Sequence, residues 1–151
     1  MTTPNVRRRR LIAAGTLSVL VRPAAATPER MAQAIAAYTG DVAPKTGRVT
    51  FEIAQLIDNG NAVPVTIRVD SPMTATDHVT GIALFNEKNP EADVIRCTLG
   101  PRAGKAEVST RIRLATSQRL TAVAKLSDGS CWQQTADVIV TLAACIEGEA
   151  P

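Results

Sequence analysis

The sequence predicts an all-β protein, an antiparallel β-sandwich of about seven short strands preceded by one short helix. From residue 49 onward, apolar side chains alternate with polar ones at the period of two that is typical of half-buried strands. Turn signals rich in Asp, Asn, Gly and Pro separate these runs. The chain has 151 residues, 45% of them hydrophobic, which is enough for one core and too few for two.

Residues 1–26 have the three parts of an export signal. Four consecutive arginines, Arg7 to Arg10, precede an apolar segment at 11–21, and small residues lead to a predicted cleavage site after Ala26. The apolar segment is well short of the roughly 20 residues that span a bilayer, so we expect no membrane anchor. The arginines before a mild apolar segment favour a twin-arginine signal, and a general secretory signal is the alternative. Both routes predict a periplasmic protein.

The net charge of +3 comes from this signal. Removing its five arginines from the 17 basic residues leaves 12 against 14 acidic ones, so the mature chain is slightly acidic. No basic stripe with interleaved aromatic residues remains. We therefore expect no nucleic-acid partner.

Residues 28–38 are predicted to form the helix. Thr27 can cap its first turn, Pro28 suits the first helical position, and Gly40 ends it. One face carries four apolar residues at helical spacing, which favours docking on the domain over ligand binding. These residues are Met31, Ala34, Ile35 and Tyr38.

Seven strands are expected after the helix. The run 106–114 alternates clearly between Ala106, Val108, Thr110, Ile112 and Leu114 on the inside and charged or hydroxyl residues on the outside. In the last run, 136–142, Ala136, Val138, Val140 and Leu142 should face inward, and Ile139 outward, where it is a candidate subunit contact. Pro64 indicates an edge position or the beginning of a strand. The expected strands are 49–53, 63–69, 79–85, 94–99, 105–114, 119–126 and 132–142.

The sequence has no motif for nucleotide binding, metal-dependent proteolysis or acyl transfer, and His78 is its only histidine. We expect no metal or cofactor. Cys97 falls inside a predicted strand and Cys131 opens another, and the two form either a disulfide or two separately buried thiols. Cys145 differs because it follows the last predicted strand, in the tail 143–151. It is either an exposed thiol that visits other proteins or a residue that packs against a partner.

Several runs of the mature chain together resemble SoxY, the sulfur-carrier subunit of the bacterial thiosulfate-oxidising Sox system. They are Asp58-Asn59-Gly60-Asn61-Ala62-Val63-Pro64-Val65, Val69-Asp70-Ser71-Pro72-Met73, Phe85-Asn86-Glu87-Lys88-Asn89-Pro90, the run 104–115, and Ser127-Asp128-Gly129-Ser130 followed by Trp132. The resemblance covers the domain at 27–142, the carrier arm at 143–151 and the twin-arginine-like signal.

This resemblance implies an immunoglobulin-like sandwich that pairs with a second β-sandwich subunit, SoxZ. It also implies that Cys145 is the covalent attachment site for sulfur. A c-type cytochrome complex joins thiosulfate oxidatively to the cysteine, a hydrolase releases sulfate, and a sulfur dehydrogenase is a further partner. The carrier itself is then not an enzyme.

The arm departs from the pattern Gly-Gly-Cys-Gly-Gly of the family. Ala143 and Ala144 precede the cysteine, and Ile146 and Glu147 follow it. Alanine restricts the backbone more than glycine does, and Glu147 places a negative charge near the thiol. Three hypotheses remain: a sulfur carrier, a SoxY-like paralogue whose cysteine serves another sulfur or redox partner, and a structural binding subunit with an idle cysteine.

Overall fold

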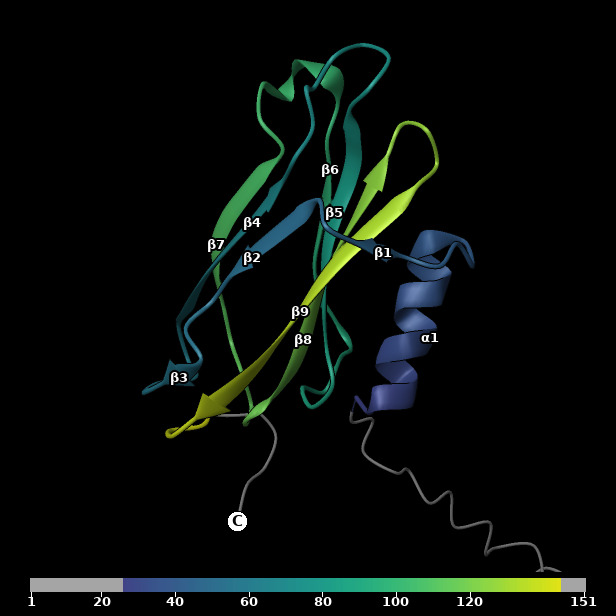
Figure 1. Ribbon diagram of the computed structural model, residues 1–151. Coiled ribbons are helices and arrows are strands. Elements are labelled where there is room, and N and C mark those ends of the chain that lie inside the picture. The colour runs from purple at the N-terminus through teal and green to yellow at the C-terminus, as the bar shows by residue number, and fades with distance from the viewer. Residues whose placement is uncertain (1–25, 145–151) are drawn as a thin grey trace, which may run out of the picture.

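The computed structural model describes residues 26–144 and has two facing β-sheets with one helix outside them (Figure 1). The helix α1 spans Pro28–Thr39, and a 3-10 turn spans Pro101–Ala103. The strands are β1 (Lys45–Thr46), β2 (Val49–Glu52), β3 (Leu56–Ile57), β4 (Val63–Val69), β5 (Val79–Asn86), β6 (Asp93–Thr98), β7 (Glu107–Ile112), β8 (Gln118–Leu126) and β9 (Cys131–Val140). This architecture is an all-β, immunoglobulin-like sandwich.

The larger sheet has the order β1-β9-β8-β5-β6, and β3 also pairs with β9. The smaller sheet has the order β2-β4-β7 and is antiparallel throughout. The segment from β1 to β3 changes sheets twice, because β1 and β3 pair in parallel with the two ends of β9 while β2 pairs with β4. The segment from β1 to β3 therefore connects β9 of the larger sheet with β4 of the smaller sheet.

The core lies between the sheets and consists of the inward residues of both. In β4 the four alternate residues from Val63 to Val69 are buried, and Pro64 and Arg68 between them are exposed. Pro64 lies near the beginning of β4, and the pairing of β2 with β4 starts only at Thr66. The missing amide of the proline therefore falls where β2 provides no partner.

The structure confirms all seven predicted strands, with boundaries that shift by at most two residues. Thr110 lies on the inner side, as predicted, because it pairs with the buried Val65, but it is exposed since β7 is an edge strand of the smaller sheet. One inward position was wrong. Leu142 is 59% exposed because β9 ends at Val140 and the chain then turns away from the sheet.

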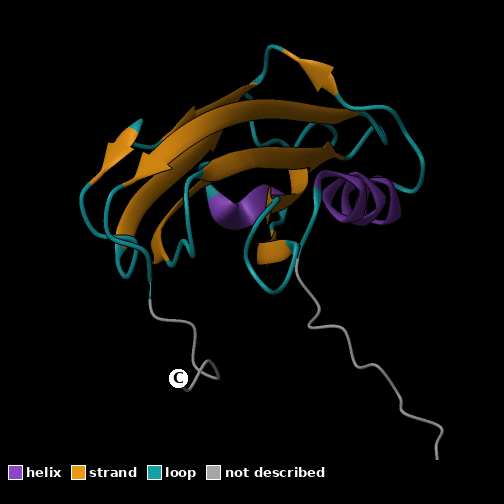
Figure 2. Cartoon of the chain, turned by 90° about the horizontal axis from the view of Figure 1, so that it is seen from below, coloured by secondary structure: helices purple, strands orange, loops and turns teal. Residues whose placement is uncertain are grey.

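The predicted helix is confirmed, including its caps. The side chain of Thr27 accepts a hydrogen bond from the amide of Arg30, and Gly40 ends the helix with a left-handed backbone at φ 67°. The predicted apolar face packs on the outer side of the larger sheet, against Ala83, Phe85 and Val123. Figure 2 shows α1 beside the sandwich in a view from below. The helix therefore closes one outer face of the sheet.

Both ends of the described chain lie at one pole of the sandwich, the lower end in Figure 1. The amide of Ala26 donates to the carbonyl of Asn89, and the side-chain oxygen of Asn89 accepts from the amide of Ala115 and from Gln118. Asn86 is fully buried and accepts from the amide of Asn89. These bonds join the loops of the pole into one unit, from which the C-terminal segment leaves.

Candidate functional site

The C-terminal segment is described up to Ala144. Of the predicted arm, Ala143 is exposed and Ala144 is buried, with 7% of its surface accessible. The predicted attachment residue Cys145 and its neighbours Ile146 and Glu147 lie outside the described residues, as does the predicted signal up to residue 25. The described part of the site consists of Ala144, directly before the cysteine, and the contacts that hold it.

A short ladder of backbone hydrogen bonds holds that residue. The amide of Ala144 donates to the carbonyl of Leu114 at 3.0 Å, and the amide of Leu114 donates to the carbonyl of Gly60 at 2.8 Å. The amide of Gly60 in turn donates to the carbonyl of Leu142 at 2.7 Å. The loop that follows β3 thus binds Leu142 directly, and Leu114, which Gly60 also binds, holds Ala144.

Further bonds hold the residues just before the ladder. The amide of Thr141 donates to the carbonyl of Ile57 at 2.9 Å, and its hydroxyl reaches the carbonyls of Ile57 and Asp58. The hydroxyl of Ser117 accepts from the amide of Val140 at 2.9 Å. The chain is consequently tied to the sandwich from the end of β9 to Ala144.

Exposed apolar side chains flank this segment. Leu56 and Ile139, each 61% exposed, are partners in the parallel pairing of β3 with β9, and Leu142 is 59% exposed. We call Leu56, Ile139 and Leu142 the apolar edge patch. The sequence predicted the outward position of Ile139, whereas β3 and the partner Leu56 were missed.

Cys97 and Cys131 are both free thiols, and the alternative of a disulfide is wrong. Cys97 pairs with Ile82 in β6, whereas Cys131 pairs with Lys125 in β9. Two strands, β8 and β5, lie between them, so their backbones are about 14 Å apart at the usual strand spacing. A disulfide requires Cα atoms within about 7 Å.

The two thiols also differ in environment. Cys131 shares the helix side of the sheet with Lys125 and is 1% exposed, and Cys97 is half-buried on the side of the core residue Ile82. Burial raises the pKa of the Cys131 thiol, and the nearby Lys125 opposes this only in part. At neutral pH Cys131 is therefore a protonated, enclosed thiol and a poor nucleophile.

Tyr38 anchors α1 above this part of the sheet. Its ring lies 5.7 Å from the ring of Phe85, and the cationic groups of Arg96 and Lys125 lie 5.4 and 5.2 Å from its centre. Lys125 also donates to the carbonyl of Tyr38 at 3.0 Å. Burial raises the pKa of Tyr38 to about 12, although Arg96 opposes the shift. The tyrosine thus serves as a neutral structural contact.

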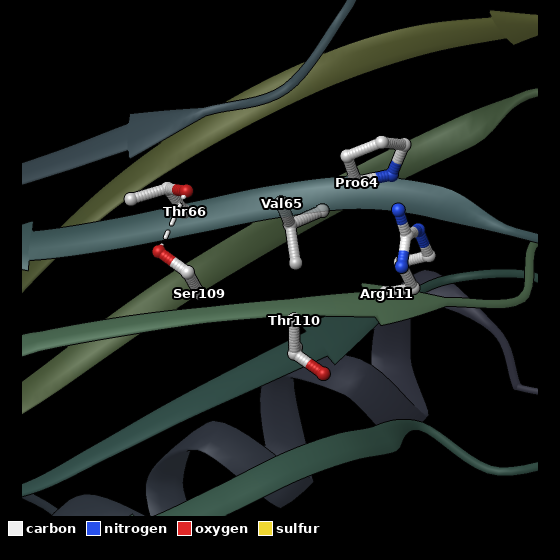
Figure 3. Close-up of a pocket in the computed structure, with 6 residues that line it drawn as sticks. All are labelled: Pro64, Val65, Thr66, Ser109, Thr110 and Arg111. Atoms are coloured by element: carbon white, nitrogen blue, oxygen red, sulfur yellow. Dashed lines mark hydrogen bonds between the residues drawn. The ribbon is translucent and has the colours of Figure 1, made fainter.

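A shallow groove of about 510 Å³ runs along β4 and β7 (Figure 3). Two of its hydroxyl groups, those of Thr66 and Ser109, hydrogen-bond to each other at 3.0 Å. It is lined by Pro64, Val65, Thr66, Ser109, Thr110 and Arg111. The groove contains none of the predicted site residues.

His78 lies at the far end of β5 from Asn86, away from the pole of Ala144. Its backbone pairs with Ser127, and its side-chain Nδ1 is buried without a hydrogen-bond partner. Within residues 26–144 no group of three or more His, Cys, Asp or Glu side chains is arranged to hold a metal ion. No helix in that part of the chain has the length and apolarity needed to cross a membrane.

The fold is a β-sandwich whose described chain ends at Ala144, which backbone hydrogen bonds hold at one pole. Over residues 35–145 the sequence matches the family described as sulfur oxidation protein SoxY. The chain belongs to the SoxY family. A comparison with curated proteins gave no match.

Several solved structures share the fold. A superoxide reductase (neelaredoxin) of Ignicoccus hospitalis is 19% identical, with a TM-score of 0.56 over 76% of this chain and 92% of its own. The superoxide reductase of Nanoarchaeum equitans is 15% identical, with a TM-score of 0.52 over 64% of this chain and 100% of its own. At these identities the likeness shows the sandwich fold alone.

Proposed function

We propose that the protein is a periplasmic covalent sulfur carrier that binds sulfur intermediates on Cys145 and presents them to the enzymes of thiosulfate oxidation. The observation that carries the proposal is the SoxY family match, which continues to residue 145 and so includes this cysteine. The chain up to Ala144 is held at one pole of the domain, where a following thiol can meet other proteins. The chain itself catalyses no step.

The chemistry of loading is a two-electron oxidation. The Cys145 thiolate and thiosulfate form one S–S bond, giving a cysteine S-thiosulfonate, and the two electrons pass to a cytochrome partner. Hydrolysis by a second partner then breaks the bond between sulfur and the sulfonate group. Water supplies the oxygen of the released hydrogen sulfate, and Cys145 keeps one extra sulfur as a persulfide, the substrate of a sulfur dehydrogenase.

The environments of Cys97 and Cys131 make them poorer candidates than Cys145 for the sulfur attachment site. Cys131 is buried at the start of β9 with a raised pKa, and Cys97 is half-buried in β6. Cys131 opens β9 whereas Ala144 follows its end, which separates them by about 30 Å along a ten-residue strand. Cys131 is therefore far from Ala144, the described residue that precedes Cys145.

We further propose that the apolar edge patch binds a SoxZ-like subunit. Leu56 and Ile139 form an exposed apolar pair on the edge of the larger sheet, a surface that suits a second β-sandwich. A twin-arginine signal would export such a pair already folded and let a partner without its own signal travel with it.

The experiment is the intact mass of the mature protein, co-produced with a SoxZ-like subunit and exposed to thiosulfate and a conjugating cytochrome. We expect added thiosulfonate or sulfur that is absent from Cys145→Ser. An unmodified mass in both proteins, with the cytochrome active on a glycine-arm carrier, would favour a paralogue or a structural subunit instead.

A further inference from the structure

We propose that Gly60 is a positioning residue for Cys145: it fastens the chain to the sandwich at Ala144 and thereby fixes the point from which the thiol is presented. The inference rests on the proposed role of Cys145 as the sulfur attachment site. Its structural part concerns only described residues and can be tested without sulfur chemistry.

Gly60 lies at the centre of the backbone ladder. It donates to Leu142 and accepts from Leu114, and Leu114 accepts from Ala144. Gly60 thus binds Leu142 directly and is connected to Ala144 through Leu114, so that it links the residues on both sides of Ala143. Backbone bonds of this kind restrain the chain without constraining which side chains follow.

The space around Gly60 excludes any side chain. A Cβ at this position would lie 2.4 Å from the carbonyl oxygen of Leu114, 3.0 Å from the amide nitrogen of Ala144 and 3.1 Å from a methyl of Val140. Two of these atoms belong to the backbone, so neither can rotate away. The backbone of Gly60 does not have a positive φ. Glycine is therefore required here by the close approach of the backbone atoms of Leu114 and Ala144, and not by an unusual backbone conformation.

The consequence for Cys145 follows from covalent geometry. Adjacent Cα atoms lie about 3.8 Å apart, so Cys145 begins one residue beyond a buried and hydrogen-bonded position. Ala144 is therefore a fixed base for the residue that follows it. An enzyme that loads it must dock at this pole of the domain.

Anchoring of Ala144 should affect the rate at which sulfur is loaded on Cys145 once the enzyme has docked. A reacting group that is already positioned loses less entropy on reaching the transition state. Releasing Ala144 should lower kcat for loading by about tenfold and leave KM unchanged, because the docking surface is intact. The rate at which Cys145 reacts with a small disulfide reagent should not change, since that reaction needs no docking.

The test compares Gly60→Ala with Gly100→Ala in the full mature chain. Gly100 is a matched control because it also lacks a positive φ and has no atom within 4 Å of an added Cβ. We expect the Ala144 amide to be protected from hydrogen exchange in the wild type and in Gly100→Ala. In Gly60→Ala it should exchange at least tenfold faster, and kcat for loading should fall without a change in KM.

An Ala144 amide that exchanges equally in Gly60→Ala and the wild type would overturn the inference, as would an unchanged kcat once the amide is released. If Gly60→Ala does not fold, Ala144→Pro breaks the bond to Leu114 by removing its amide donor, and the same loss of kcat is expected. Absence of sulfur adducts on the wild type, with a protected Ala144 amide, would refute the proposed function and the positioning role but leave the anchor intact.

Discussion

Leu56 and Ile139 lie opposite each other in the parallel pairing of β3 with β9, and each keeps 61% of its surface exposed. Two large apolar side chains on adjacent strands form a contiguous patch, which is more informative than one isolated exposed residue. Their position next to the tethered C-terminal segment makes this the surface that we assign to the partner subunit.

A charge in the patch should weaken subunit binding. We expect Ile139→Lys to reduce affinity for a SoxZ-like subunit by at least about tenfold, because a lysine cannot be desolvated at the centre of an apolar contact. Isothermal titration measures the effect. Val42→Lys is the control, since Val42 is 43% exposed in the loop after α1. Equal affinities of the two variants would place the interface elsewhere.

The described cysteines should remain thiols in the oxidised protein. Thiol titration of unfolded Cys145→Ser, with and without prior reduction, should give two thiols in both cases, because Cys97 and Cys131 are two strands apart in the sheet. A gain of thiols upon reduction would contradict the strand order of the larger sheet.

Stability should fall at high pH through Tyr38. Burial raises its pKa from 10.0 to about 12, so the folded state favours the neutral phenol. This contribution is complete below pH 10 and is lost as the pH rises from 10 to 12. Denaturant unfolding should show a steeper loss over this range in the wild type than in Tyr38→Phe. Parallel curves would show that the phenol is not protected by the fold.

The docked helix should contribute to global stability. Met31→Ala removes a buried side chain that packs with Phe85 and should lower the free energy of unfolding by about 2 kcal/mol. Gln33→Ala, on the exposed side of the same helix, should change it by less than about 0.5 kcal/mol. Urea denaturation measures both. A similar loss in the two variants would mean that helix propensity, not docking, dominates.

The composition of the arm should affect partner choice. Replacing Ile146 and Glu147 with glycine widens the backbone freedom after Cys145, removes one negative charge and leaves the Ala144 anchor unchanged. We expect faster loading by enzymes that normally use a glycine arm. Turnover measured against the wild-type arm checks this, and an unchanged rate would show that arm flexibility is not limiting.

Local sequence patterns predicted the elements that depend on local rules. The caps of α1 and the alternation in β4 appear in the structure as expected, because capping and burial periodicity are encoded within a few residues. The turn at Ser127 to Ser130 has a similar local origin, with the side chain of Asp128 accepting from the amide of Ser130.

What the sequence could not predict depends on contacts between distant segments. β3 is two residues long and exists because it pairs with the end of β9. Gly60 looked like an ordinary turn residue in Asp58-Asn59-Gly60-Asn61, and only the approach of Leu114 and Ala144 reveals its packing role. Leu142 continued the alternating pattern, but the strand had already ended. The exclusion of a disulfide likewise required the strand order.

The most direct test of the carrier function uses a chain in which Cys145 is the sole thiol. Cys97→Ser with Cys131→Ser, bound to its partner subunit, is exposed to thiosulfate and the conjugating cytochrome, beside Cys145→Ser, and the intact masses are measured. We expect full sulfur loading of the first protein and none of the second. Loading of Cys145→Ser, or none of the single-thiol protein while the wild type is loaded, would contradict the assignment of Cys145 as the attachment site.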